Sequence, residues 1–117
     1  MTAKRQTKGK KMKLFVIHRL EELDSNVPET EIGGVFLTEI GANEALADWI
    51  LELAKKDSDF ARDLAEDENH EDLDPTAKGI PTREYILSEI VSTGGYTVYA
   101  NTNLYKFDIT ETFLTEK

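Results

Sequence analysis

The chain contains no cysteine among its 117 residues. A disulfide framework, a thiolate nucleophile and a cysteine-ligated zinc site are therefore excluded. The sequence also lacks any Asn-x-Ser/Thr acceptor for N-linked glycosylation. These absences favour an intracellular protein, and we expect it to be cytoplasmic.

Long apolar runs are absent as well. The longest uninterrupted run after the basic start covers residues 14–17, whereas a secretory signal needs about 7–15 apolar residues and a membrane-spanning helix about 20. We expect neither secretion by that route nor a membrane partner. His18 and His70 are the only histidines and show no zinc-binding spacing, so no metal and no cofactor is predicted.

Charge is strongly segregated along the chain. Residues 1–13 carry a charge of +6 with no acid, which leaves −15 on the rest of a chain whose net charge is −9. We expect residues 1–13 to form a basic disordered tail, which acts as a solvated arm, as a nuclear-import or nucleic-acid signal, or as a clamp on the acidic body. The tail contacts would be Lys4, Arg5, Lys8, Lys10, Lys11 and Lys13.

Residues 14–117 are expected to form a single domain, because this length supports one modest core. Residues 14–20 are rich in β-formers and predict a central strand, with Phe15 and Ile17 on one face and Leu14, Val16 and His18 on the other. A loop over residues 21–32 and a second strand over residues 35–39 are expected to follow.

The middle of the chain predicts helices. Apolar residues recur at helical spacing from Ala42 to Leu53, with Asn43 as a candidate cap. A short second helix is expected over residues 60–65, then a mobile acidic loop near residues 65–80, and a third element over residues 82–91 for which we prefer a helix to a strand. Trp49, on the apolar helix face, is expected in the core.

Residues 96–113 predict a β-hairpin across residues 101–103. With strand pairs at both ends and helices between them, the sequence predicts an α+β fold of order β-β-α-(α)-α-β-β. The sheet should be four-stranded and mainly antiparallel, with helices packed on one face.

The segment from Gly34 to Ala45 is a strand that leads into an Ala-Asn-x-Ala helix start at Ala42-Asn43-Glu44-Ala45. In this box, and in the glycine, short strand, polar turn and alternating strand of residues 95–113, the chain resembles small uncharacterised intracellular proteins of filamentous fungi. The resemblance covers about two thirds of the chain. It implies a fold but no catalytic residues.

Two site motifs fail on their spacing. A calcium loop that starts at Asp67 would have Asp72 where a glycine is needed and Lys78 where a bidentate glutamate is needed. The Gly33-Gly34 and Gly94-Gly95 pairs lack a phosphate-binding context and are interpreted as turn glycines. His18 has no visible partner nucleophile, so we favour a hydrogen-bonded structural histidine over a catalytic base.

The missing catalytic constellation and the charge favour a small non-catalytic interaction module that binds a basic protein partner through its acidic surface. The expected contacts are Glu66, Asp67, Glu68, Glu71 and Asp72. One alternative is a ligand-binding protein or enzyme with a pocket between sheet and helices. The other is a homo-oligomer held by tail-body charge attraction. A body charge of −15 argues against nucleic acid as a partner.

Overall fold

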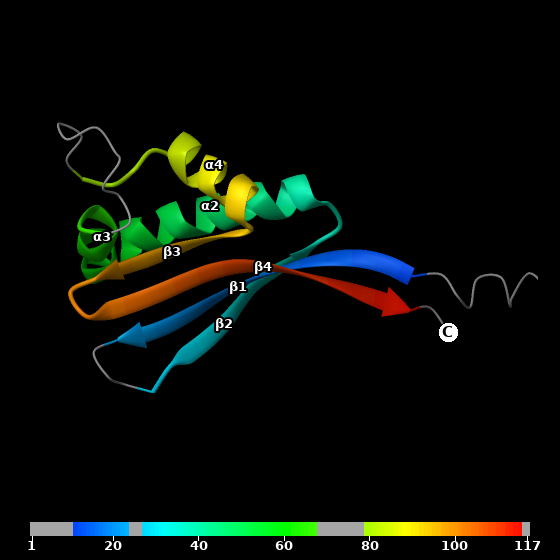
Figure 1. The fold of residues 1–117 in the computed structure, drawn as a ribbon, viewed down its shortest axis with the longest axis horizontal. Helices are drawn as coiled ribbons and strands as arrows, with labels where there is room; N and C mark the ends of the chain where they lie inside the picture. The colour runs from blue at the N-terminus through cyan, green and yellow to red at the C-terminus, as the bar shows by residue number, and fades with distance from the viewer. Residues whose placement is uncertain (1–10, 24–26, 68–78, 116–117) are drawn as a thin grey trace, which may run out of the picture.

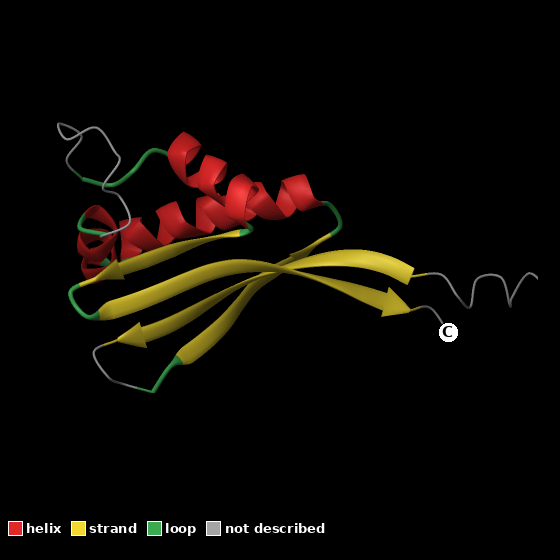
Figure 2. Ribbon diagram, viewed as in Figure 1, coloured by secondary structure: helices red, strands yellow, loops and turns green. Residues whose placement is uncertain are grey.

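The computed structural model describes residues 11–23, 27–67 and 79–115. These residues form one four-stranded antiparallel sheet with three helices on one of its faces (Figures 1 and 2). The predicted α+β class and element order are confirmed. The elements are β1 (Lys11–Leu23), β2 (Glu29–Phe36), α2 (Glu39–Lys56), α3 (Ser58–Ala65), α4 (Arg83–Thr93), β3 (Gly95–Ala100) and β4 (Asn103–Thr115).

The sheet has the strand order β2-β1-β4-β3, so β1 is central as predicted. The two central strands pair along their whole length, from Lys11 opposite Thr115 to Leu23 opposite Asn103. The predicted alternation in β1 also holds, because Phe15 and Ile17 are 7% and 2% exposed beneath the helices. Leu14, Val16 and His18 lie half-buried on the open face.

The core lies between the helices and the covered face of the sheet. Leu46 and Ile50 of α2, Phe60 of α3 and Phe107 of β4 are all fully buried. The rings of Phe60 and Phe107 meet edge to face, with 5.7 Å between their centroids. Each such side chain contributes about 1.5–3 kcal/mol by its removal from water, so these few contacts hold both layers together. Trp49 packs half-buried against this core, as predicted.

Side-chain caps fix the helix boundaries. The Thr38 hydroxyl accepts from the Gly41 N–H at 3.0 Å, so α2 begins at Glu39 and the expected start at Ala42 with Asn43 as cap is wrong. Asp57 ends α2 and also caps α3. The short second helix and the helix preferred for residues 82–91 are both confirmed.

Strand β2 departs most from the sequence prediction. The expected loop over residues 21–32 and strand over residues 35–39 are wrong, because β1 continues to Leu23 and β2 starts at Glu29. Pairing with β1 overrides the acidic composition there. Gly33 lies inside β2, next to the register shift opposite Ile17 and His18, rather than in a turn. A Cβ on Gly33 would lie 2.5 Å from the Trp49 ring, so this close approach requires glycine.

The expected basic tail is too long at its C-terminal end. Residues 11–13 belong to β1, where pairing with β4 makes them a strand, so the tail boundary at residue 13 is wrong. Residues 1–10 and 68–78, which hold the rest of the tail and most of the expected acidic loop, lie outside the described residues. Within the described ranges, no helix is both long enough and apolar enough to cross a membrane.

The predicted hairpin is confirmed with a two-residue loop. Asn101 and Thr102 have φ angles of 54° and 65°, and Ala100 pairs with Asn103 on either side of them. Two successive residues with positive φ match the twist of the flanking strands. Thr102 is β-branched, so this conformation costs it more than it would cost glycine.

The substitution Thr102→Gly should therefore raise the stability of the fold. We expect a gain of about 0.5–1 kcal/mol in the free energy of unfolding, measured by urea denaturation. Thr97→Gly is the matched control, because Thr97 lies in extended β3 and its loss should destabilise. A Thr102→Gly variant less stable than the parent chain would contradict the strain assigned to the turn.

Candidate functional site

A fully buried carboxylate joins α3 to the β3–β4 hairpin. Asp63 has 0% exposed surface and accepts hydrogen bonds from Asn101 Nδ2 at 2.8 Å, Asn103 Nδ2 at 2.9 Å and the Tyr105 hydroxyl at 2.7 Å. Burial by itself raises the pKa of a carboxyl group, but these three donors outweigh it and lower the pKa of Asp63. Asp63 therefore remains ionised inside the fold.

The hairpin turn makes a second contact with the end of α3. The Asn101 amide also donates to Glu66 Oε1 at 2.7 Å. Tyr105 has its pKa raised, first by burial and then by its hydrogen bond to Asp63, so its hydroxyl stays protonated and able to donate. The hydrogen bond to Asn101 thus holds Glu66, the residue that follows α3, against the turn between β3 and β4.

Asp67 closes part of the outer edge of β3. It is 5% exposed, and its Oδ1 accepts from the Tyr99 backbone N–H at 3.0 Å. Because Tyr99 directs this N–H away from β4, the carboxylate takes the place of a neighbouring strand. Asp67 is thereby placed next to the groove that runs along this edge.

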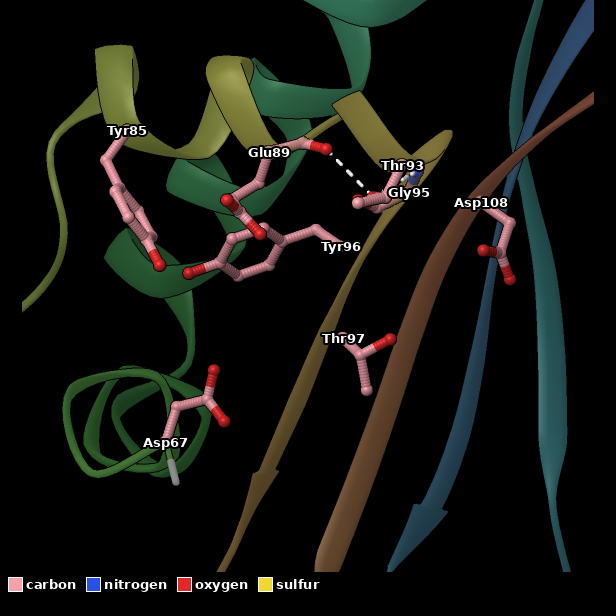
Figure 3. A pocket seen from close by; sticks show the side chains of 8 residues that line it. All are labelled: Asp67, Tyr85, Glu89, Thr93, Gly95, Tyr96, Thr97 and Asp108. Atoms are coloured by element: carbon pink, nitrogen blue, oxygen red, sulfur yellow. Dashed lines mark hydrogen bonds between the residues drawn. The ribbon is translucent and has the colours of Figure 1, made fainter. Parts of the chain in front are cut away.

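The groove lies between α4, the end of α3 and β3, and has a volume of about 520 Å³. Figure 3 shows Tyr85 and Glu89 of α4 gathered with Tyr96 on the helix side of β3, while Thr97 and Asp108 lie beyond that strand. The rings of Tyr85 and Tyr96 are edge to face, with centroids 6.5 Å apart. Its full lining is Asp67, Tyr85, Glu89, Thr93, Gly95, Tyr96, Thr97 and Asp108.

The electrostatics of the groove are one-sided. Among the residues that the structure describes, its lining includes three carboxylates, from Asp67, Glu89 and Asp108, and no cationic side chain. Burial and then the Asp67 charge raise the pKa of Tyr96, so its phenol stays neutral. Carboxylates beside aromatic rings are suited to a cation, which gains from both the charges and the ring faces.

A second groove, between α2 and the start of α4, lacks this bias. Its lining pairs the acids Asp48 and Glu52 with the bases Lys55 and Arg83. Arg83 Nε donates to Asp48 Oδ1 at 2.7 Å, so the charges there already compensate each other. The groove along β3 is therefore the candidate site for a basic ligand.

The structure separates the five predicted acidic contacts. Asp67 lines the groove but is buried, with its carboxylate bonded to Tyr99, so it is not the exposed contact that the charge run suggested. Glu66 is exposed and bonded to Asn101. Glu68, Glu71 and Asp72 lie outside the described residues. Sequence reasoning missed Glu89 and Asp108, because only the fold brings them beside Asp67.

The predicted tail contacts are divided in the same way. Lys4, Arg5, Lys8 and Lys10 lie outside the described residues, and Lys11 lies in β1. Lys13 is a strand residue whose Nζ lies 3.8 Å from Glu111 Oε2 and 6.0 Å from the Phe113 ring centroid. The Lys13 charge therefore interacts with residues of its own sheet.

His18 is a hydrogen-bonded residue on the open face, where it lies opposite the groove residue Asp108. Its Nε2 lies 2.6 Å from Thr110 Oγ1, in line with the structural histidine favoured from sequence. The groove lining does not include it. Among residues 11–23, 27–67 and 79–115, no three histidine or acidic side chains converge in a group that could hold a metal ion.

No protein-family model, curated protein or solved structure matches this chain. The resemblance to small fungal proteins stays a prediction.

The Asp63 network can be tested with Asp63→Asn. The substituted amide keeps one acceptor oxygen and puts an NH2 group in place of the other, so this NH2 group would face either Asn101 Nδ2 or the Asn103 and Tyr105 donors. We therefore expect a loss of about 2–4 kcal/mol in the free energy of unfolding at neutral pH. Urea denaturation measures it. Asp59→Asn, an exposed change on the same helix, should cost under about 1 kcal/mol. Equal losses in the two variants would show that the buried carboxylate has no special role.

The difference in the free energy of unfolding between the parent chain and Asp63→Asn should also depend on pH. A folded-state pKa below the unfolded value of about 3.9 contributes stability that is fully present above that value. This stability is lost as the pH falls through the folded pKa. The difference between the parent chain and Asp63→Asn should therefore shrink from pH 7 to about pH 3, and a constant difference would contradict an ionised Asp63.

Proposed function

We propose that this protein is a small non-catalytic interaction module that binds a basic protein partner through its acidic surface. The observation that carries the proposal is the groove along β3, whose lining in the described part of the chain has three carboxylates and two tyrosines but no cationic side chain. A lysine or arginine side chain of the partner would enter this groove. The expectation of a cytoplasmic protein belongs to the same proposal.

The chemistry of the groove supports a cationic ligand in two ways. Glu89 and Asp108 approach it from α4 and β4, on either side of β3, so a positive charge between them is attracted from both directions. The Tyr85 and Tyr96 rings offer aromatic surface to the stem of a long side chain and to its charged end. Glu66 and the acids Glu68, Glu71 and Asp72 would extend the same attraction.

The proposal predicts that neutralising the groove weakens binding of a basic peptide. We expect Glu89→Gln combined with Asp108→Asn to raise the dissociation constant of a fluorescent oligo-arginine peptide by about 3- to 20-fold at low salt. Fluorescence anisotropy measures it. Added salt should reduce the difference in dissociation constant between the parent chain and the variant, because salt screens exposed charges.

The matched control removes the same charge elsewhere on the helical layer. Glu44→Gln with Glu84→Gln changes two exposed acids of α2 and α4 that do not line the groove. A small effect in this control supports a site at the groove. Equally weakened peptide binding in both double variants would indicate diffuse charge attraction. An unchanged affinity in the groove variant would show that the peptide does not bind in the groove.

A small cationic ligand is the alternative occupant. The volume of about 520 Å³ lies in the range of small-molecule sites, which keeps the ligand-binding class open. Thermal stabilisation by a small aromatic amine, abolished by the groove variant and absent with the basic peptide, would favour this alternative.

A further inference from the structure

The central strands extend beyond the rest of the sheet as a two-stranded ribbon, made of residues 11–14 of β1 and 112–115 of β4. β2 ends with Phe36 opposite Phe15, and β3 begins with Gly95 opposite Asp108. In Figure 1 this ribbon projects past the helical layer on the right. A two-stranded ribbon on its own is only marginally stable in water. Contact with another layer or another strand would therefore stabilise this one.

Apolar side chains lie on both faces of the ribbon. Phe113 is 51% exposed on the helix side, while Met12 and Leu114 are 52% and 57% exposed on the open side. The other edges of the sheet are protected against strand addition. β2 carries Glu29, Glu31 and a bulge, and β3 is closed by Asp67 at Tyr99.

In the described part of the chain, the outer edge of β4 beyond Ile109 lacks the protection against strand addition that β2 and β3 have. The Ile109 N–H points to this side, because it donates to the Gly94 carbonyl at 3.2 Å. Backbone groups of alternate residues point the same way along a strand, so Glu111 and Thr115 direct theirs to this side too. No described strand lies beside them there. This edge therefore has the chemistry to receive an extended strand.

We propose that the β4 edge of a second copy of this chain occupies this position, with the two strands antiparallel about a two-fold axis at Phe113. In this register Glu111 of each copy exchanges backbone hydrogen bonds with Thr115 of the other. The two Phe113 rings become neighbours on the helix side, and each Leu114 meets the other Thr112. Aromatic and apolar cross-strand pairs of this kind stabilise sheets.

Charge selects the second copy over a basic partner at this edge. Glu111 is the one acid among residues 110–115, and it is balanced by Lys13 at 3.8 Å. Two acidic bodies repel each other at the helical layer and at β2, whereas in this register no acids face each other, because Glu111 of each copy lies opposite Thr115 of the other. A basic partner gains little from an edge whose one acid is balanced and whose neighbouring strand carries Lys11 and Lys13, and it is directed to the acidic groove instead. The proposed dimer therefore uses a different surface from the groove of the proposed function.

The experiment measures the mass of the full chain by sedimentation equilibrium across a concentration range, at about 0.15 M and about 1 M salt. We expect a dimer of the 13.2 kDa chain at both salt concentrations. Glu111→Pro should raise the dimer dissociation constant at least about tenfold. It removes an N–H that points outward while the bonds of β4 to β1 remain.

The matched control is Glu111→Gln, which removes the same charge but keeps the N–H, and it should remain dimeric. Near-ultraviolet circular dichroism of Trp49 checks that each variant is folded. A parent chain that is monomeric throughout would overturn the proposal. So would a Glu111→Pro variant that dimerises like the parent, or a dimer lost at high salt, since the latter indicates charge attraction between tail and body.

A second variant keeps the test decisive if Glu111→Pro fails to fold. The chain has no cysteine, so a single introduced cysteine can form a disulfide only with its counterpart in another copy. Phe113→Cys, at the two-fold axis, should give a disulfide-linked dimer on mild oxidation, and Thr97→Cys on β3 should not. Equal cross-linking of both, or of neither, would overturn the proposed register.

Discussion

The structure depends on the buried charge of Asp63. A carboxylate with no exposed surface is tolerated only when its lone pairs are satisfied, and all three of its close donors come from the β3–β4 hairpin. Since the donors lie on the turn and on β4 while the acceptor lies on α3, neither element can move without leaving the charge unsolvated. This one carboxylate fixes the short helix α3 over the end of the sheet.

The outer edge of β3 follows from that constraint. Asp67 lies four residues after Asp63, and the anchored helix end brings its carboxylate to the Tyr99 N–H. At the other end of the strand, the Thr93 hydroxyl bonds the Gly95 carbonyl at 2.8 Å. The edge is thus closed by side chains rather than by a strand, and both of these side chains, Asp67 and Thr93, also line the groove. Asp67 therefore serves both in edge protection and in the acidic lining.

The fold could be predicted from sequence where local patterning and tertiary packing agree. The alternation of Phe15 and Ile17, the helical face of α2 and the hairpin across residues 101–103 each have a local cause, and each was confirmed. β2 could not be predicted, because its acidic residues form a strand only through pairing with β1. The candidate groove could not be predicted either. Glu89 and Asp108 lie 22 and 41 positions from Asp67 in the sequence, and no local signal relates them.

The groove and the ribbon are neighbours on β4, since Asp108 lines the groove and the ribbon begins at Thr112. In the proposed dimer β4 of the second copy runs in line with β3, and its last strand residue, Thr115, lies opposite Glu111. Two acidic bodies joined at this edge still repel each other over longer distances. A basic partner in each groove would reduce that repulsion and so favour association. By linkage, association would then favour partner binding by the same factor. In the proposed dimer the two surfaces would therefore be coupled through charge, without any change of shape.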